Sequence, residues 1–314
     1  MRLALMLVLL SLALDSAAAT GRIFVSNEKG DSVSVIDGKT NQVIKTIVVG
    51  KRPRGVGLAP DGSAVYVAIS GANHIAVINP QSLEVTGRFP SGDDPEAFAV
   101  HKNGNIYISN ENDAKASVYD PHTGKLVAEI EVGIEPEGVA VSPDGTRAIV
   151  TSESTNMLHI IAIPEHTVVN SILVGARPRS VTFSADGKLA YATSEIGGEV
   201  KKIDVASGTI LGKTALSDDQ AKPKDIVVSR DGKQLYVAGG RANRVFVLDA
   251  NNLDIITSVA VGKRVWGLAL SRDGQRLYTT DGVDNQVSVI ETKSRSVVAK
   301  IAVGEAPWGI TIDD

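Results

Sequence analysis

Residues 132–162, VGIEPEGVAVSPDGTRAIVTSESTNMLHIIA, contain the unit from which most of the chain is built. The unit opens with Val-Gly and a Pro, continues through an apolar run to an Asp-Gly turn, and then carries two further apolar runs. These runs are rich in Val, Ile and Ala and are bounded by Gly, Pro, Asp and Ser, which is typical of short β-strands. The Asp-Gly pair favours a tight hairpin, because glycine adopts a positive φ without steric cost.

The unit recurs along the whole chain with a period of about 42 residues, which is the size of a propeller blade. Its Val-Gly landmark is found at Gly50, Gly133, Gly175, Gly262 and Gly304, and less regular copies lie at Gly92 and near Asp219. The hairpin turn repeats in phase as APDG (59–62), HKNG (101–104), SPDG (142–145), SADG (184–187) and SRDG (229–232 and 271–274). A fixed period of this length with several strands per copy predicts a β-propeller with four strands per blade.

The two chain ends complement each other. Residues 307–314, PWGITIDD, supply only the first strand of a last unit, whereas RIFVSN, VSVID and VIKTIVV near the start supply the other three. We therefore predict an all-β fold, a seven-bladed β-propeller with four antiparallel strands per blade over residues 20–314. Its closing blade is built from both chain ends, which leaves no unpaired blade edge in the ring.

Residues 1–19 differ in composition from the repeats. Arg2 precedes a run of twelve apolar residues, 3–14, and Ala17 and Ala19 occupy the positions of a small-residue cleavage site. This pattern predicts a secretory signal peptide, and the apolar run is too short to span a bilayer. We therefore expect a periplasmic or secreted protein without a membrane span. The formal charge of −4 gives no reason to expect nucleic acid as a partner, and we expect a monomer.

The second and third strands of several copies resemble the YVTN family of β-propeller repeats over essentially all of residues 20–314. They read RIFVSNEKGDSVSVID (22–37), NIYISNENDAKASVYD (105–120), QLYVAGGRANRVFVLD (234–249) and RLYTTDGVDNQVSVIE (276–291), with VGxxPxGVAxSPDG between them. The overall layout is most similar to periplasmic propellers associated with pyrroloquinoline quinone (PQQ)-dependent alcohol catabolism. That resemblance implies an accessory role beside a quinoprotein dehydrogenase. Lactone hydrolases, the d1-haem domain and amine dehydrogenase subunits share the seven-bladed fold, so the fold does not choose the function.

A candidate binding site follows from the repeat. In a propeller, the loops that enter the innermost strands surround the axial channel on one face. The residues after the Pro position in these loops, here named the mouth residues, are Arg54, Glu96, Glu137, Arg179, Lys224, Trp266 and Trp308. Two neighbouring indoles are suited to stack a flat ring or to anchor a protein loop. Arg54, Arg179 and Lys224 are suited to hold carboxylates.

One alternative without a ligand is open for the same residues. The tryptophans would fill the funnel, while Arg54–Glu96 and Glu137–Arg179 would form exposed ion pairs across blades, each worth about 0–1 kcal/mol. A second loop on this face adds four glutamates, which are Glu28, Glu111, Glu153 and Glu195. We expect them to be solvated charges and assign no metal, because a hard cation needs several converging oxygens.

No catalytic residue and no cofactor are assigned. The five histidines, His74, His101, His122, His159 and His166, lack the spacing of a zinc site, and none is expected at the mouth. The chain has no cysteine, which excludes c-type haem. GTILGKT (208–214) is one residue short of a phosphate-binding loop and is expected on a fourth strand.

The expected function is therefore a non-catalytic periplasmic propeller that binds a partner protein or a small ligand at the channel mouth. One alternative is a lactone hydrolase, for which the resemblance implies an Arg, His and Glu cluster in the channel. Arg and Glu are present, but the His is lacking. A second alternative is a redox partner that docks on a dehydrogenase such as a periplasmic quinoprotein.

Overall fold

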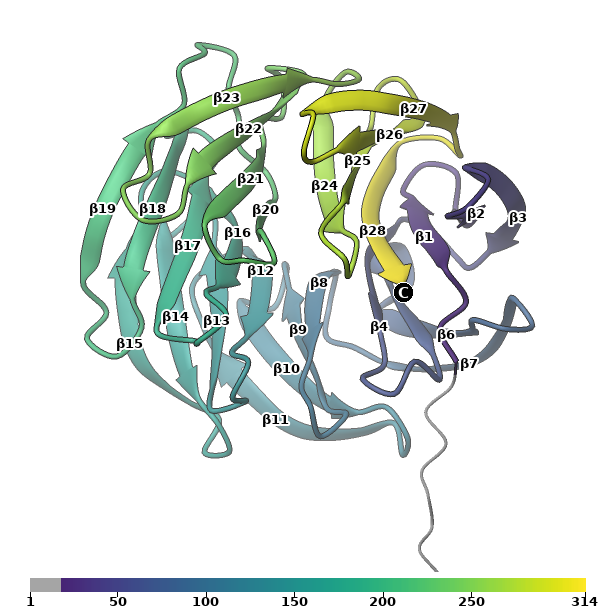
Figure 1. Ribbon diagram of the computed structural model, residues 1–314. Coiled ribbons are helices and arrows are strands. Elements are labelled where there is room, and N and C mark those ends of the chain that lie inside the picture. The colour runs from purple at the N-terminus through teal and green to yellow at the C-terminus, as the bar shows by residue number, and fades with distance from the viewer. Residues whose placement is uncertain (1–17) are drawn as a thin grey trace, which may run out of the picture.

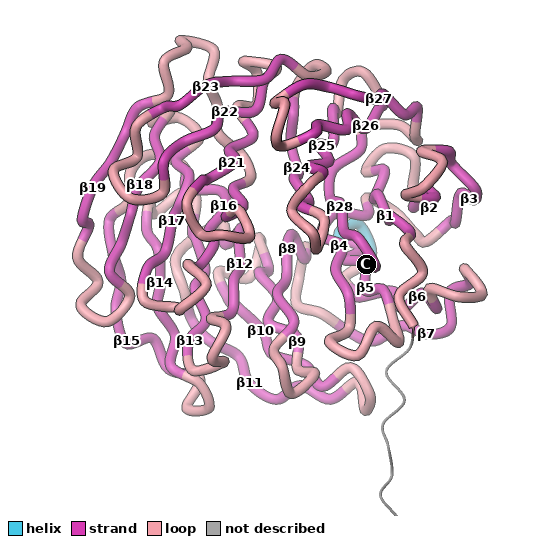
Figure 2. Tube along the Cα trace, in the orientation of Figure 1, coloured by secondary structure: helices cyan, strands magenta, loops and turns pink. Residues whose placement is uncertain are grey.

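The computed structural model describes residues 18–314, which form seven four-stranded antiparallel sheets around a central axis (Figure 1). Strands and short loops account for nearly all of the trace in Figure 2. Within the described residues the helical structure is limited to one 3-10 turn, η1 (Ser70–Ala72). The prediction of an all-β, seven-bladed propeller with four strands per blade is confirmed.

Six sheets follow one another along the chain, and each begins with its innermost strand. The first two contain β4 (Pro53–Leu58), β5 (Val65–Ile69), β6 (His74–Asn79) and β7 (Glu84–Pro90), then β8 (Pro95–Val100), β9 (Ile106–Asn110), β10 (Lys115–Asp120) and β11 (Lys125–Glu131). The next two contain β12 (Pro136–Val141), β13 (Arg147–Ser152), β14 (Met157–Ala162) and β15 (Thr167–Leu173), then β16 (Pro178–Phe183), β17 (Leu189–Ser194), β18 (Glu199–Asp204) and β19 (Ile210–Ala215). The last two contain β20 (Ile226–Val228), β21 (Gln234–Ala238), β22 (Arg244–Asp249) and β23 (Ile255–Ala260), then β24 (Val265–Leu270), β25 (Arg276–Asp281), β26 (Gln286–Glu291) and β27 (Ser296–Ala302).

The seventh sheet joins the chain ends, as predicted. Its order is β28 (Pro307–Asp313), β1 (Arg22–Asn27), β2 (Ser32–Asp37) and β3 (Gln42–Val48). The ladder between β1 and β28 is antiparallel and places Val25 opposite Ile310 and Arg22 opposite Asp313. Gly21 N donates a further hydrogen bond to the Asp313 carbonyl at 2.7 Å. The ring is therefore closed by backbone hydrogen bonds between residues nearly 300 positions apart.

The hydrophobic core lies between neighbouring sheets. The second and third strands of each blade are buried along most of their length, because both of their faces pack against adjacent blades. One cluster joins Phe24 and Val35 of the closing blade to Val67 and Ile69 of β5. β-branched side chains fill these layers, which agrees with the low aromatic content of the chain.

Side-chain hydroxyls fix the mouth residues at the top of the innermost strands. The pairing of β12 with β13 shifts register between Pro136 and Val139, as in a β-bulge. At that point Gly138 N donates to Thr151 Oγ1 at 2.8 Å, and Thr151 Oγ1 donates to the Arg179 carbonyl of the next blade at 3.1 Å. Ser26, Ser109, Thr193 and Thr280 contact the carbonyls of the following mouth residues in the same way.

The turns before six of the seven mouth residues share a backbone conformation. The residue two positions earlier has a positive φ in six blades, and these residues are Arg52, Asp94, Glu135, Arg177, Arg264 and Ala306. A left-handed conformation at a residue with a Cβ costs about 1–2 kcal/mol. Because six blades share it, the conformation belongs to the repeat and is not a mark of one functional loop.

The predicted signal peptide, residues 1–19, falls almost entirely outside the described residues. Across the described range, 18–314, no helix is long and apolar enough to cross a membrane.

Candidate functional site

The seven mouth residues gather around the axis, each at the start of an innermost strand. Six occupy the second position of their strand, and Lys224 lies just before β20, which begins later than its counterparts. Arg54 forms an ion pair with Glu96, and Arg179 Nη1 lies 2.9 Å from Glu137 Oε1. The rings of Trp266 and Trp308 neighbour each other, with centroids 6.1 Å apart and planes inclined by 44°. The predicted pairs and the predicted indole neighbours are thus present.

The ion pairs are not exposed, contrary to the expectation from the sequence. Glu96 has an exposed fraction of 0%, and Glu137 and the Arg179 side chain are also close to fully buried. Side chains from the loops between second and third strands, among them Glu153 and Glu195, pair with Arg179 and add to this burial. Pairs in such an environment differ from surface pairs, because removal of one partner leaves the other charge without solvation.

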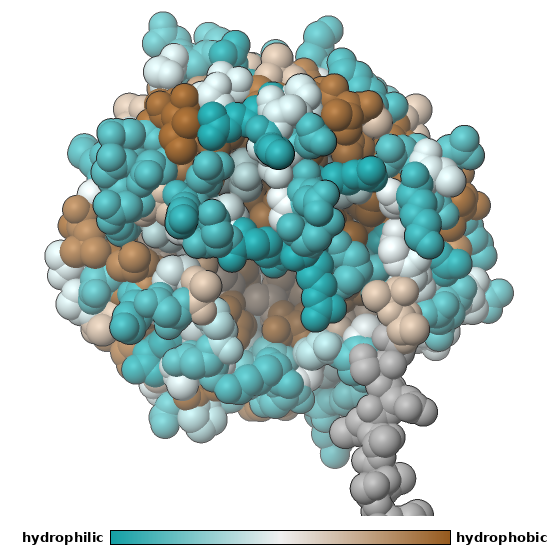
Figure 3. Space-filling model, in the orientation of Figure 1, coloured by the Kyte–Doolittle hydropathy of each residue, from teal (hydrophilic) through white to brown (hydrophobic). Residues whose placement is uncertain are grey.

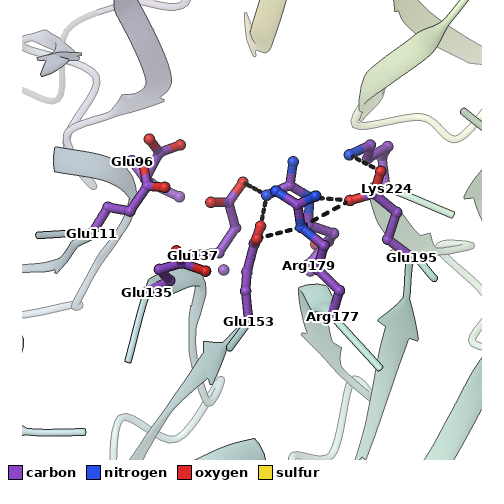
Figure 4. Close-up of polar contacts among 12 residues, drawn as sticks. Glu96, Glu111, Glu135, Glu137, Glu153, Arg177, Arg179, Glu195 and Lys224 are labelled. Carbon is purple, nitrogen blue, oxygen red and sulfur yellow. Dashed lines mark hydrogen bonds and ion pairs between the residues drawn. The ribbon is translucent and has the colours of Figure 1, made fainter. Parts of the chain in front are cut away.

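Arg179 is the centre of a network that spans three blades (Figure 4). Its guanidinium pairs with Glu137 and Glu153 of the preceding blade and with Glu195 of its own blade, whose Oε2 lies 3.0 Å away. Glu195 in turn pairs with Lys224 of the following blade. Arg177 pairs with Glu153 and lies 3.5 Å from Glu195. The expectation that the second-loop glutamates are solvated charges is therefore wrong for these two, since both point inward and pair with arginines.

The other two second-loop glutamates contact Arg54. Its Nη2 lies 3.2 Å from Glu28 Oε1, and its Nη1 lies 3.6 Å from Glu111 Oε2. Carboxylate oxygens of Asp94, Glu96 and Glu111 lie within 4.8 Å of one another, a spacing that suits a cation. The Arg54 guanidinium already contacts two of these three groups, so we assign no metal here. Burial, with Glu137 nearby, raises the pKa of Glu111.

Lys224 is the most enclosed of the basic mouth residues. It is 6% exposed, and its Nζ lies 2.7 Å from Glu195 Oε1 and 4.0 Å from the ring centroid of Trp266. Burial, reinforced by the positive charge of Arg179, lowers the pKa of Lys224 to about 7. Burial alone would raise the pKa of Glu195, but the charges of Arg179 and Lys224 outweigh it and lower that pKa.

The lowered pKa of Lys224 predicts a pH-dependent signal. The chain contains two tryptophans, both at the mouth, and loss of the proton from Lys224 removes a cation from the face of Trp266. We expect tryptophan fluorescence to change with a midpoint near pH 7. The transition should be absent in Lys224→Met, and a wild-type midpoint above pH 9 would contradict the assignment.

The lowered pKa of Lys224 also predicts how folding stability changes with pH. The folded pKa lies below the ordinary value of 10.5, so the unfolded chain binds more protons between about pH 7 and 10.5. The unfavourable contribution of Lys224 is therefore complete below pH 7 and disappears as the pH rises toward 10.5. Relative to Lys224→Met, the wild-type protein should gain stability across this window, as measured by urea unfolding at several pH values.

An axial pocket of about 210 Å³ opens beneath one part of the mouth. Glu137, Arg179, Lys224, Trp266 and Trp308 form its upper wall, so five of the seven mouth residues share it. Its deeper wall is apolar and consists of Val56, Phe98, Val139, Val181 and Ile310. Figure 3 shows the opposite end of the channel, where the innermost strands end and the C-terminus lies; this face is mainly hydrophilic and is hollowed at its centre, where apolar surface lines the recess. Arg54 and Glu96 do not line the pocket, and no histidine of the described residues does.

Asp225 is a pocket residue that the sequence analysis missed. Its carboxylate accepts hydrogen bonds from Ser180 Oγ at 2.8 Å and from Leu268 N at 2.9 Å, and burial raises its pKa. A signal was present in the repeat. The position after each mouth residue holds a small residue in the other six blades, namely Gly55, Ala97, Gly138, Ser180, Gly267 and Gly309. Asp225 is the one carboxylate at this repeat position, so the aligned copies already distinguish the blade of Lys224 from the other six.

Comparison with known proteins gives the fold relatives of this chain. A 143-residue part is 29% identical to antigen Lp49 of Leptospira interrogans, covering 43% of this chain and 31% of the antigen, so the match spans about a third of the antigen's length. A protein of unknown function from Desulfotomaculum acetoxidans superposes with a TM-score of 0.81 at 19% identity, covering 93% of this chain and 98% of that one. A proposed 6-phosphogluconolactonase of Bacteroides fragilis superposes with a TM-score of 0.78, at the same identity and coverage.

These structural likenesses show the fold alone, and the resemblance to YVTN repeats and to PQQ-associated propellers stays a prediction. The family is shown by a different comparison. The choice-of-anchor I domain matches residues 76–297, which is more than two thirds of the sequence and includes five of the seven mouth residues. The chain therefore belongs to the choice-of-anchor I domain family.

Proposed function

We propose that this propeller binds a small organic ligand in the axial pocket beneath the mouth and does not convert it catalytically. One observation carries the proposal: a pair of cationic side chains, Arg179 and Lys224, shares a single cavity with two indoles and an apolar wall. Ligand sites characteristically combine a largely apolar lining with a few polar groups that fix orientation. The volume of about 210 Å³ lies below that of drug-sized pockets, so the ligand is small.

The arrangement favours one orientation of the ligand. A polar head would lie near Lys224, Arg179 and Glu137, which line the upper wall. The body of the ligand would extend along Val139 and Ile310 toward the centre of the channel. Among the described residues no cation lies over the ring of Trp308, in contrast to that of Trp266, so the Trp308 ring is available to the ligand.

We also propose that the protein acts outside the cytoplasm as an accessory to quinoprotein alcohol oxidation, with the mouth face as the docking surface. The support is the sequence resemblance together with the signal-peptide pattern of residues 1–19. The family match to a choice-of-anchor domain is in keeping with a surface or secreted protein.

Tryptophan fluorescence tests the pocket directly, because both tryptophans lie in its wall. Benzoate, an aromatic carboxylate, is expected to change the emission in a saturable manner. Val139→Phe fills the deeper pocket and should weaken benzoate at least about tenfold, which corresponds to about 1.4 kcal/mol. Val298→Phe adds the same bulk on the exposed outer strand β27 and should leave the titration unchanged.

Two results would overturn this function. Equal benzoate affinity in Val139→Phe and the wild-type protein would place binding outside the pocket. Hydrolysis of a small lactone that is lost in Glu137→Gln would favour the lactone hydrolase instead, since Glu137 and Arg179 both line the pocket.

A further inference from the structure

The strongest unexplained feature of the pocket is that a lysine, rather than an arginine, occupies its most enclosed basic position. Lys224 lines the cavity, and it is the one lysine of the described residues that does so. A lysine amine is a nucleophile when it is neutral, whereas a guanidinium stays charged and unreactive. The question is therefore whether the surroundings favour the neutral amine.

Three cationic groups crowd the ring of Trp266. Lys224 Nζ lies 4.0 Å from the ring centroid, and the guanidinium carbons of Arg264 and Arg179 lie at 4.9 and 5.4 Å. Each of these cations is attracted to the ring, but three positive charges gathered around one ring repel each other. Lys224 is the member of this group that can release a proton, and its burial adds to the tendency. A desolvated lysine beside another cation is a recurring form of an activated amine.

We propose that Lys224 captures a small aldehyde or ketone in the axial pocket by forming an imine. This inference rests on the proposed function, since it names the ligand class of the same pocket. The mouth would thus hold a carbonyl compound covalently and reversibly, without oxidising or reducing it.

The contacts around Lys224 provide the proton transfers that the reaction needs. The ammonium first gives one proton to Glu195, whose Oε1 is 2.7 Å from Nζ. The free electron pair of Nζ then forms a bond to the carbonyl carbon, and the carbonyl oxygen takes up the proton from Glu195 to give a carbinolamine. The carbinolamine nitrogen then returns one proton to Glu195, which passes it to the hydroxyl, and departure of that hydroxyl as water leaves an iminium ion. Ammonium and carbonyl compound are thus converted into iminium ion and water, with no net proton uptake and no electrons exchanged.

The position of Glu195 also suits the product. The iminium ion carries its positive charge at the former ammonium nitrogen, so it keeps the ion pair with Glu195 and the contact with Trp266. The substituent of the carbonyl carbon would extend into the apolar wall formed by Val56, Val139 and Ile310. A small, apolar aldehyde with a flat ring therefore matches the cavity best.

Reductive trapping on the intact protein tests the proposal. The protein is incubated at pH 7 with benzaldehyde and cyanoborohydride, and the modified lysines are located by peptide mass mapping. We expect the modified fraction at Lys224 to exceed that at Lys51 at least about tenfold at limiting reagent. Lys51 is a suitable comparator because its side chain is largely exposed and its hydrogen bond with Asp31 raises its pKa, which keeps it protonated.

Three variants separate the chemical step from folding and from binding. Lys224→Arg retains the positive charge but forms no imine, so its labelling should fall to the background of the exposed lysines. Val139→Phe keeps Lys224 and should reduce labelling by blocking the pocket. Glu195→Gln keeps the size of the side chain and should slow labelling at Lys224 without affecting Lys51. Thermal unfolding of each variant identifies any that fail to fold.

The outcomes also separate this inference from the proposed function. Labelling of Lys224 no greater than that of Lys51, with saturable benzoate binding intact, would overturn the imine and leave the ligand pocket standing. If Lys224 were not preferentially labelled and benzoate did not bind in a saturable manner, both the imine and the ligand pocket would be overturned. Preferential labelling of Lys224 that persists unchanged in Val139→Phe would show a reactive amine outside the pocket geometry and would also contradict the inference.

Discussion

A chain that ends at Ala306 is expected to lose cooperative unfolding, because it lacks β28 and the ring cannot close. Removal of β28 takes the innermost strand from the closing blade, so β1 loses its ladder to residues such as Ile310. It also exposes the inner faces of the neighbouring first strands, β4 and β24, which pack against β28. The loss should exceed about 5 kcal/mol, the lower end of the total stability of natural domains.

Circular dichroism during heating, together with size-exclusion chromatography, measures this effect. The full chain should unfold in one transition, whereas the chain ending at Ala306 should be expanded or aggregated. A chain ending at Asp313 serves as the control, since it keeps β28 and loses only the exposed last residue and its hydrogen bond to Arg272 N. Unfolding of the chain ending at Ala306 within a few degrees of the control would show that the ring does not depend on its closing strand.

Replacement of Arg179 by methionine is expected to cause the second-largest loss of stability. The substitution retains most of the side-chain volume but leaves Glu137, Glu153 and Glu195 near the mouth without their shared cation. Glu153 is 2% exposed, so water cannot replace the lost partner. Breaking a buried pair by removing one partner typically costs about 3–5 kcal/mol, and we expect a value in that range from urea unfolding.

Lys51→Met is the matched control for this prediction. Lys51 forms an ion pair with Asp31 at 2.8 Å, but its side chain is 77% exposed. Surface pairs contribute about 0–1 kcal/mol, so this variant should remain close to the wild-type protein. Equal effects of the two substitutions would mean that the mouth network behaves as surface charge, as the sequence alone suggested.

A compensating substitution sharpens the same experiment. Glu153→Gln keeps the shape of the buried side chain and removes one of the three charges that Arg179 pairs with. Combined with Arg179→Met, it should recover part of the stability, and the two effects should fail to add by about 0.5–3 kcal/mol. Strict additivity would contradict a direct coupling between the two groups.

Much of the architecture follows from local patterns in the chain. The period of about 42 residues, the Asp-Gly hairpins and the alternation of apolar runs each specify short antiparallel strands in a repeated order. A repeat also carries equivalent positions to equivalent places in the ring, so aligned copies name all seven mouth residues. The pairing of Arg54 with Glu96 and the neighbouring indoles of Trp266 and Trp308 follow from adjacency of blades alone.

The charge state and burial of the site could not be predicted in this way. Arg179 meets Glu153 and Glu195, which lie in loops between second and third strands, and the repeat period does not specify the conformation of these loops. Asp225 was overlooked for a related reason: its role depends on Ser180 and Leu268 in neighbouring blades.

The order of strands, the number of blades and the identity of the residues around the axis are thus written in the linear chain, because each depends on short-range patterns repeated at a constant interval. Which of those residues share a cavity, which charges are removed from water and which lysine can lose its proton depend on distances between blades. Such distances arise only when all seven sheets are packed around the axis, and solvation at the mouth is a property of that complete ring.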